Sequence, residues 1–192
     1  MHRALGLAAL ALTASACHPK QSSATGAASH CAGTALLVTE DGVGTLSLDS
    51  SIAALRAQCP QARDTSWLTM TSYDSAIVIS LPGATILAIQ DSILQPNQPA
   101  DLWVITGDSV RLPRNLSLTS SWATIARTYG RFTSSLSYDI TNSSVVFCGM
   151  KGMGFKVLTD ALTDSAVAAA AHPTDVSIAR YIARYLPPDT CK

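Results

Sequence analysis

The chain has 192 residues, of which 47% are hydrophobic and 14% are charged, with 13 basic and 13 acidic side chains. This apolar content is enough to bury a core and excludes a disordered chain. The balanced charge excludes electrostatic attraction to nucleic acid or to anionic lipid as the basis of function, so we expect no nucleic-acid partner.

Residues 1–16 have the features of a bacterial export signal. Arg3 precedes a short apolar stretch over residues 4–12, whereas a permanent membrane span needs about 20 apolar residues. The next residues, TASAC, end at Cys17 and resemble the lipobox of bacterial lipoproteins, although Ala14 stands where that pattern usually has Leu. The resemblance implies that Cys17 is lipidated, becomes the mature N-terminus and anchors the protein to a membrane.

An ordinary signal-peptidase site of A-x-A type, Ala14-Ser15-Ala16, is the competing interpretation and would give a secreted or soluble periplasmic protein. Cysteine parity favours lipidation, because exported cysteines are usually paired. With Cys17 lipidated, four cysteines remain, an even number suited to two disulfides: Cys31, Cys59, Cys148 and Cys191.

Residues 17–30 contain no large apolar side chain after Cys17 and are predicted to form a flexible tether. His18 follows the cysteine where lipoproteins retained at the inner membrane often carry Asp. The resemblance therefore implies an outer-membrane protein that faces the periplasm. Loss of Arg3 with the signal leaves 12 basic and 13 acidic residues, a net charge of about −1.

One pattern occurs twice, as TLSLDSSIAALRAQCP from Thr45 and as NLSLTSSWATIARTYG from Asn115, with six identities in sixteen positions. We interpret it as a duplication, with a first unit over residues 31–110 and a second over 111–192. In each copy, leucines that alternate with serine predict a half-buried strand. A short helix follows, capped by Ser50 or Ser51 in the first copy and by Ser120 or Ser121 in the second.

The apolar positions behind these caps have the spacing i, i+3, i+7 and share one helix face: Ile52, Leu55 and Cys59 in the first copy, and Trp122, Ile125 and Tyr129 in the second. Pro60 and Gly130 are expected to end the two helices. Helices this short are marginal alone, so each needs a sheet to pack on.

The remaining apolar runs predict that sheet: residues 66–73, 76–81, 84–91 and 102–106 in the first unit, and 135–140, 143–148 and 154–159 in the second. Residues 161–173 predict a second short helix before Pro173, and residues 175–186 a C-terminal helix capped by Asp175, although alternation of Val176 and Ile178 also fits a strand. The predicted fold class is α+β: two tandem repeats, each a short helix on an antiparallel sheet, plus a C-terminal helix. The pattern leaves open whether the two sheets join.

The duplication suggests one disulfide within each unit, Cys31 with Cys59 and Cys148 with Cys191. Loops of these lengths stabilise a fold by about 3.5 to 4 kcal/mol in the chain-entropy model. Four cysteines allow three pairings, so this assignment is a hypothesis.

A lipobox followed by strand, capped helix and antiparallel strands resembles the group that includes the β-lactamase-inhibitor protein and the small lipoprotein of the outer-membrane β-barrel assembly machinery. The resemblance covers Thr45 to Tyr73 and Asn115 to Asp139. It implies tandem units whose concave sheet binds a partner protein. The Gly-Met that usually precedes the helix in the group is replaced by Asp49-Ser50 and Thr119-Ser120, and no functional residue is transferred.

No catalytic or metal-binding motif was identified, and we expect no cofactor. His18, His30 and His172 lack the spacing of metal ligands, and an exported Cys31 beside His30 is more often oxidised than metal-bound. Glu40-Asp41 fits a solvated turn, and CGMKGMGF from Cys148 fits a hairpin, because a phosphate loop would lead into a helix. Trp67, Trp103 and Trp122 are expected to pack in the core, with a ligand surface as the alternative.

The leading functional hypothesis is therefore a non-enzymatic, lipid-anchored envelope protein that binds another protein. An envelope hydrolase with an unrecognised site is the alternative from a different class. A purely structural lipoprotein is the third.

Overall fold

The computed structural model describes residues 31–33, 35–68, 73–90, 97–136, 141–150, 152–179 and 182. The predicted signal and tether, with Cys17, lie outside these residues. The fold is α+β, as predicted, with short helices packed on antiparallel sheet. Among the described helices, none is long and apolar enough to cross a lipid bilayer.

The first half of the chain begins with a three-stranded meander and continues through one helix into four long strands. Its elements are β1 (Val38–Thr39), β2 (Gly42–Val43), β3 (Leu46–Ser47), α1 (Ile52–Gln58), β4 (Arg63–Leu68), β5 (Tyr73–Leu81), β6 (Ala84–Gln90) and β7 (Leu102–Thr106).

The second half repeats this order, with one hairpin in place of the meander and with two short helices inserted before its last strand. Its elements are β8 (Arg111–Leu112), β9 (Leu116–Ser117), α2 (Trp122–Tyr129), β10 (Phe132–Leu136), β11 (Asn142–Phe147), β12 (Met153–Leu158), the 3-10 helix η1 (Thr159–Leu162), α3 (Ser165–Ala170) and β13 (Asp175–Ile178).

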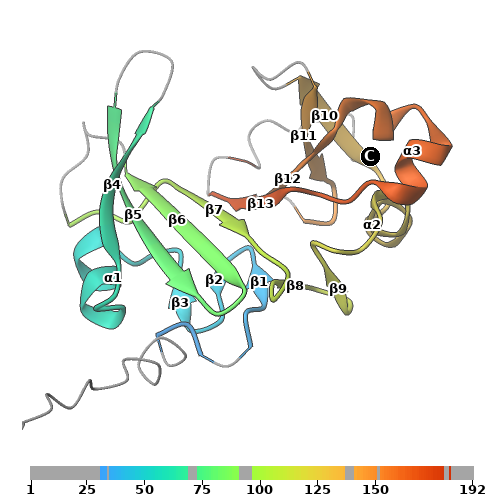
Figure 1. Cartoon of the computed structure of the whole chain (residues 1–192). Coiled ribbons are helices and arrows are strands. Elements are labelled where there is room, and N and C mark those ends of the chain that lie inside the picture. The colour runs from blue at the N-terminus through green and yellow to red at the C-terminus, as the bar shows by residue number, and fades with distance from the viewer. Residues whose placement is uncertain are drawn as a thin grey trace, which may run out of the picture.

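The long strands of both halves form one eight-stranded antiparallel sheet in the order β10-β11-β12-β13-β7-β6-β5-β4. The last strand of each half lies at the centre, where β7 and β13 pair with Ile105 opposite Val176 and Val104 opposite Ser177. The two halves therefore share one sheet, which the sequence pattern had left open. Figure 1 shows the two halves side by side.

One face of this sheet, here called the core face, carries the main hydrophobic core, to which the buried residues of α1, α2 and the short hairpins also belong. Rows of apolar residues cross the core face from strand to strand, such as Ile79, Ile86, Ile105, Val176, Phe155 and Val145. The opposite face, here called the open face, carries the alternate residues of the strands. In Figure 1 α1 and the short strands β1–β3 lie below the sheet.

Both repeat helices begin and end as predicted. The side chain of Ser51 accepts a hydrogen bond from the Ala54 amide at 3.2 Å, and that of Ser121 accepts one from Thr124 at 3.3 Å. Each satisfies one of the amides that the first helical turn leaves unpaired. The three apolar positions predicted on each helix are all buried.

Two sequence predictions were wrong. Asp175–Ile178 form the central strand β13 instead of the first turn of a helix, because Val176 and Ile178 both enter the core on alternate positions. Residues 66–73 were predicted as one strand, but they span the end of β4 and the start of β5, which pair with Leu68 opposite Tyr73. The rest of the predicted C-terminal helix, apart from Ala179 and Ile182, lies outside the described residues.

Candidate functional site

A groove of about 370 Å³ lies on the open face of the sheet. Six of the eight strands contribute to it, and its lining is made of apolar side chains, serine hydroxyls and one acid–base pair: Trp67, Leu102, Val104, Ser135, Ser144, Val146, Gly154, Phe155, Lys156, Asp175, Ser177 and Ile182. Both halves of the chain are therefore needed to form it.

The groove exists because the sheet is strongly curved. In a flat sheet, with strands about 4.8 Å apart, the seven spacings between β4 and β10 would separate these strands by about 34 Å. Yet Trp67 of β4 and Ser135 of β10 line the same cavity. The two edge strands must therefore incline towards each other over the open face, and Figure 1 shows the two halves of the sheet inclined around that space.

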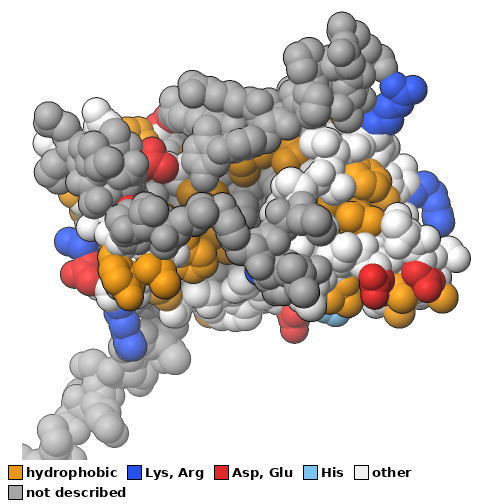
Figure 2. Space-filling view, turned by 90° about the horizontal axis from the view of Figure 1, so that it is seen from above, with side chains coloured by type: hydrophobic (Ala, Val, Ile, Leu, Met, Phe, Trp, Pro, Cys, Tyr) orange, Lys and Arg blue, Asp and Glu red, His pale blue; other side chains and the backbone are white. Residues whose placement is uncertain are grey.

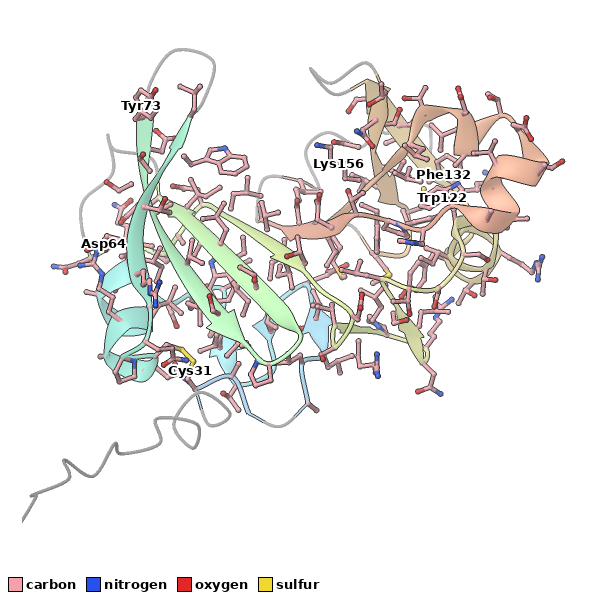
Figure 3. The ribbon with its side chains drawn as sticks, in the orientation of Figure 1. Cys31, Asp64, Tyr73, Trp122, Phe132 and Lys156 are labelled. Atoms are coloured by element: carbon pink, nitrogen blue, oxygen red, sulfur yellow. A yellow bond between two sulfur atoms is a disulfide. The ribbon has the colours of Figure 1, made fainter. Side chains whose placement is uncertain are left out.

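Lys156 and Asp175 supply the charges of the groove. They lie directly opposite each other on β12 and β13, and Figure 3 shows Lys156 between the two halves of the sheet. Burial raises the pKa of the Asp175 carboxyl, while a hydrogen bond from Thr174 at 3.1 Å and the positive charge of Lys156 oppose this shift. The groove thus offers one cation and one partly desolvated acid to a ligand.

Trp67 extends the apolar surface of the groove on the edge strand β4, where its side chain is 40% exposed. Leu68 and Tyr73, which lie opposite each other where β4 and β5 pair, are 63% and 67% exposed but point to the other face of the sheet, because neighbouring residues of a strand alternate between faces. Figure 3 shows Tyr73 at the upper end of this hairpin. Viewed from above, hydrophobic side chains are visible in several separate groups, some near the middle and some at the periphery (Figure 2). Exposed apolar patches are typical of interaction sites.

The predicted Cys31–Cys59 disulfide is confirmed, with the two Cα atoms 5.0 Å apart. It joins the start of the described chain to the end of α1 (Figure 3). Cys148 is also disulfide-bonded. Because Cys191 lies outside the described residues, its pairing with Cys148 stays a prediction, and so does lipidation of Cys17.

The three tryptophans have different environments. Trp103 and Trp122 are buried in the core, as expected, whereas Trp67 lines the groove and takes the alternative role of a surface residue. Trp122 lies in a cluster of ring contacts with Phe132 and Phe147, at 5.6 and 5.5 Å between centroids. The indole nitrogen of Trp103 is buried and has no hydrogen-bond partner among the described residues.

A second cavity, of about 350 Å³, lies between the β1–β2 turn and the end of α2. Glu40 and Asp41 line it and are exposed at the turn, as the sequence predicted. His172 is exposed, and the described residues contain no group of three His, Cys, Asp or Glu side chains that could hold a metal ion.

Tyr129 and Arg114 form the other wall of this second cavity. The Tyr129 hydroxyl donates to the Pro113 carbonyl at 2.9 Å, and burial raises the pKa of Tyr129 to about 12 against the opposing charge of Arg114. The Arg114 guanidinium donates to the Thr128 carbonyl at 2.6 Å and lies 5.9 Å from the Tyr129 ring centroid. The phenol of Tyr129 and the guanidinium of Arg114 therefore already have partners within the chain that explain their positions structurally.

Of the residues that line the groove, the sequence indicated only Trp67 as a candidate for a ligand surface. Lys156 occurred in a predicted strand without further significance, and Asp175 was assigned as a helix cap. The alternation of side chains along β12 was the only signal available. Phe155 and Val157 point into the core, so Lys156, between them in the sequence, points to the open face.

The fold and groove together define an α+β protein built on one large, curved antiparallel sheet with an open, partly apolar face. No protein-family model matches the sequence, and no curated protein matches it. A crystal structure of an uncharacterised protein from Escherichia coli, yfeY, has a similar fold, with a TM-score of 0.57 at 8% identity. The similarity covers 74% of this chain and 99% of that one, and at this identity it shows the fold alone.

Proposed function

We propose that this protein is a non-enzymatic lipoprotein of the bacterial envelope, anchored through Cys17, whose groove binds a partner protein. The observation that supports binding is the groove itself, which both halves of the chain form and which includes the exposed side chain of Trp67. Large aromatic side chains next to a partly apolar groove provide the central contacts of many protein interfaces.

The lining suits an extended segment of polypeptide. Apolar walls such as Leu102 and Val104 would accept side chains, and the hydroxyls of Ser135, Ser144 and Ser177 would pair with polar groups of the segment. The groove is open along the sheet, which favours a macromolecular ligand over a small molecule that requires enclosure.

Capture of partners from chemically cross-linked envelopes tests this function. Ser177 lies at the centre of the groove on β13, so Ser177→Trp should fill it without changing the core face. Ser80→Trp is the matched control, because Ser80 is exposed on β5 and does not line the groove. We expect the same partner with the wild type and the Ser80 variant and at least a tenfold lower yield with the Ser177 variant, about the effect of losing one central contact.

Failure to recover any partner above background, or equal recovery with both variants, would contradict the proposal. Hydrolysis of peptidoglycan, peptide or ester substrates by the purified protein would instead support the enzymatic alternative.

A mass spectrum of the mature protein tests the anchor. We expect an N-terminus at Cys17 with the added mass of lipid, and release of the Cys17→Ser variant into the soluble fraction. An unmodified cysteine at the mature N-terminus would show that ordinary signal peptidase cleaves after Ala16, and that the protein is soluble.

A further inference from the structure

Strand β4 is an edge of the eight-stranded sheet within the described part of the chain. It is the last strand in the order, and among the described residues it pairs only with β5. All six of its residues are exposed, and its pairing runs from Arg63 to Leu68 without a bulge. Natural edge strands are often blocked by proline, charged side chains, a bulge or shortness. β4 has six residues without proline, lysine or a bulge, and of its two charged side chains Asp64 already forms an ion pair with Arg56.

We propose that a second copy of this chain pairs with β4 edge to edge, in antiparallel register, with Thr65 opposite Thr65 of the second copy. This contact uses the edge of β4 and does not depend on the partner of the groove, although Trp67 also lines that groove. It would join two eight-stranded sheets into one continuous sheet across a two-fold axis.

Charge selects this register over its neighbours. A two-fold axis perpendicular to the sheet places the open faces of the two copies on the same side. Because directly opposed residues of antiparallel strands point to the same face, the axis must pass through a residue of β4 and not between two residues. An axis at Asp64 would place two carboxylates opposite each other, and an axis at Ser66 would place Asp64 opposite Leu68. Both arrangements are unfavourable, because directly opposed side chains lie about 5 Å apart.

An axis at Thr65 gives complementary pairs on both faces. On the open face, Arg63 lies opposite Trp67 of the second copy, which allows its guanidinium to stack on the indole ring. On the other face, Ala62 lies opposite Leu68, and the paired Asp64 lies opposite Ser66. Each pair of residues occurs twice in the interface. The β4 edge of each copy is occupied by the other copy, so no β4 edge stays free and the assembly is a closed dimer.

Sedimentation of the full chain carrying Cys17→Ser, which removes the lipid, tests the dimer in solution. Trp67→Lys should weaken dimerisation at least about tenfold, because two lysines replace the indoles opposite Arg63 and two stacking contacts are lost. Leu158→Lys is the matched control, since Leu158 is 44% exposed on another strand and should leave the dimer unchanged.

The double variant Arg63→Glu/Trp67→Lys tests the register itself. It places a glutamate at position 63 and a lysine at position 67. These two side chains can form an ion pair, and so restore dimerisation, only if residue 63 faces residue 67 of the second copy. Recovery to within about threefold of the parent is expected, since a cross-strand ion pair is worth about as much as the contact it replaces.

Cross-linking of the lipidated protein in membranes gives an independent readout. Thr65→Cys, treated with a short bifunctional thiol reagent, should yield a dimer on a gel. Ser134→Cys on the other edge strand, β10, should not. A parent chain that stays monomeric at every concentration, no dimer from Thr65→Cys, or a Thr65→Cys product with a different protein would each overturn the proposal.

Discussion

Substitution of Gly44 by alanine is expected to be among the most destabilising single-methyl changes in this protein. Gly44 has φ +58°, and the equivalent position of the second repeat is occupied by Arg114, with φ 61°. Both residues adopt the left-handed conformation, which costs a side-chain-bearing residue about 1 to 2 kcal/mol. The two positions therefore share a backbone requirement, although only one of them carries glycine.

Their surroundings explain the difference. A Cβ at Gly44 would lie 1.9 Å from the carbonyl oxygen of Ala32 and 3.0 Å from that of Ala35. Ala32 is fully buried, and its carbonyl also accepts the Thr45 amide at 3.1 Å. Relief of the overlap would break that hydrogen bond, worth about 1 kcal/mol. With the backbone strain included, Gly44→Ala should cost about 2 to 3 kcal/mol.

Arg114→Ala is the matched variant, because it leaves the backbone strain in place and removes only exposed contacts. Loss of the guanidinium bond to Thr128 and of stacking on Tyr129 should cost about 1 kcal/mol. Arg114→Gly should then recover roughly 1 kcal/mol relative to Arg114→Ala, since glycine adopts this conformation without strain.

Equilibrium urea unfolding of the full-length Cys17→Ser chain, followed by tryptophan fluorescence, measures all three variants against one parent. A cost below about 1 kcal/mol for Gly44→Ala, or one no larger than that of Arg114→Ala, would contradict this prediction. Lower stability of Arg114→Gly than of Arg114→Ala would also contradict it, because the left-handed backbone at residue 114 would then carry no strain.

Three further predictions concern single features of the fold. Replacing Cys31 and Cys59 together by serine should lower the free energy of unfolding by about 3.5 kcal/mol, given their separation of 28 residues; a loss below 1 kcal/mol by urea unfolding would contradict it. Trp103→Phe should change the free energy of unfolding by less than about 1 kcal/mol, because it loses buried volume but also removes a buried indole N–H that has no partner among the described residues. Trp103→Ala, which leaves a large cavity, should cost about 3 to 5 kcal/mol. The raised pKa of Asp175 means that its protonated form favours folding, so its contribution is fully present below the unfolded value of about 3.9 and is lost as pH rises through the folded pKa. Asp175→Asn should therefore gain stability relative to the parent between pH 3 and pH 7, and a constant difference over that range by urea unfolding at each pH would refute the assignment.

The repeat helices could be predicted from the sequence because their signals are local. A serine cap, apolar residues at i, i+3 and i+7, and a terminating proline or glycine all lie within one short segment. The strand over residues 102–106 was also placed with its observed bounds. In each case, the residues that determine the element are the residues that form it.

The error at β13 had a different origin. Residues 175–186 satisfy a period of 3.6 at several positions, while Val176 and Ile178 satisfy a period of two over a shorter run. The duplication held the deciding information: if the first unit ends in the strand 102–106, the second should end in an equivalent strand. Alignment of the two units over their full length predicts a strand at the position of β13, which pairs with β7 at the centre of the sheet.

The groove could not be predicted, because its geometry depends on how far the sheet curves. Trp67, Ser135 and Asp175 lie on three strands far apart in the sequence, and they meet only after eight strands have paired in one register. Period-two patterning assigns each residue to a face of its own strand. It does not reveal that two edge strands incline towards each other over that face.

The two repeats secure one equivalent position by different chemistry. Cys59 ends α1 and is bonded to Cys31, whereas its counterpart Tyr129 ends α2, where its hydroxyl donates to the Pro113 carbonyl and its ring packs against Phe147. Both contacts tie the last turn of a short helix to the chain that precedes it. Since an isolated helix of seven or eight residues is unstable, each repeat needs such a tie at its helix end. What the two halves share is therefore the place of the constraint, while the covalent bond and the buried aromatic ring are alternative means of supplying it.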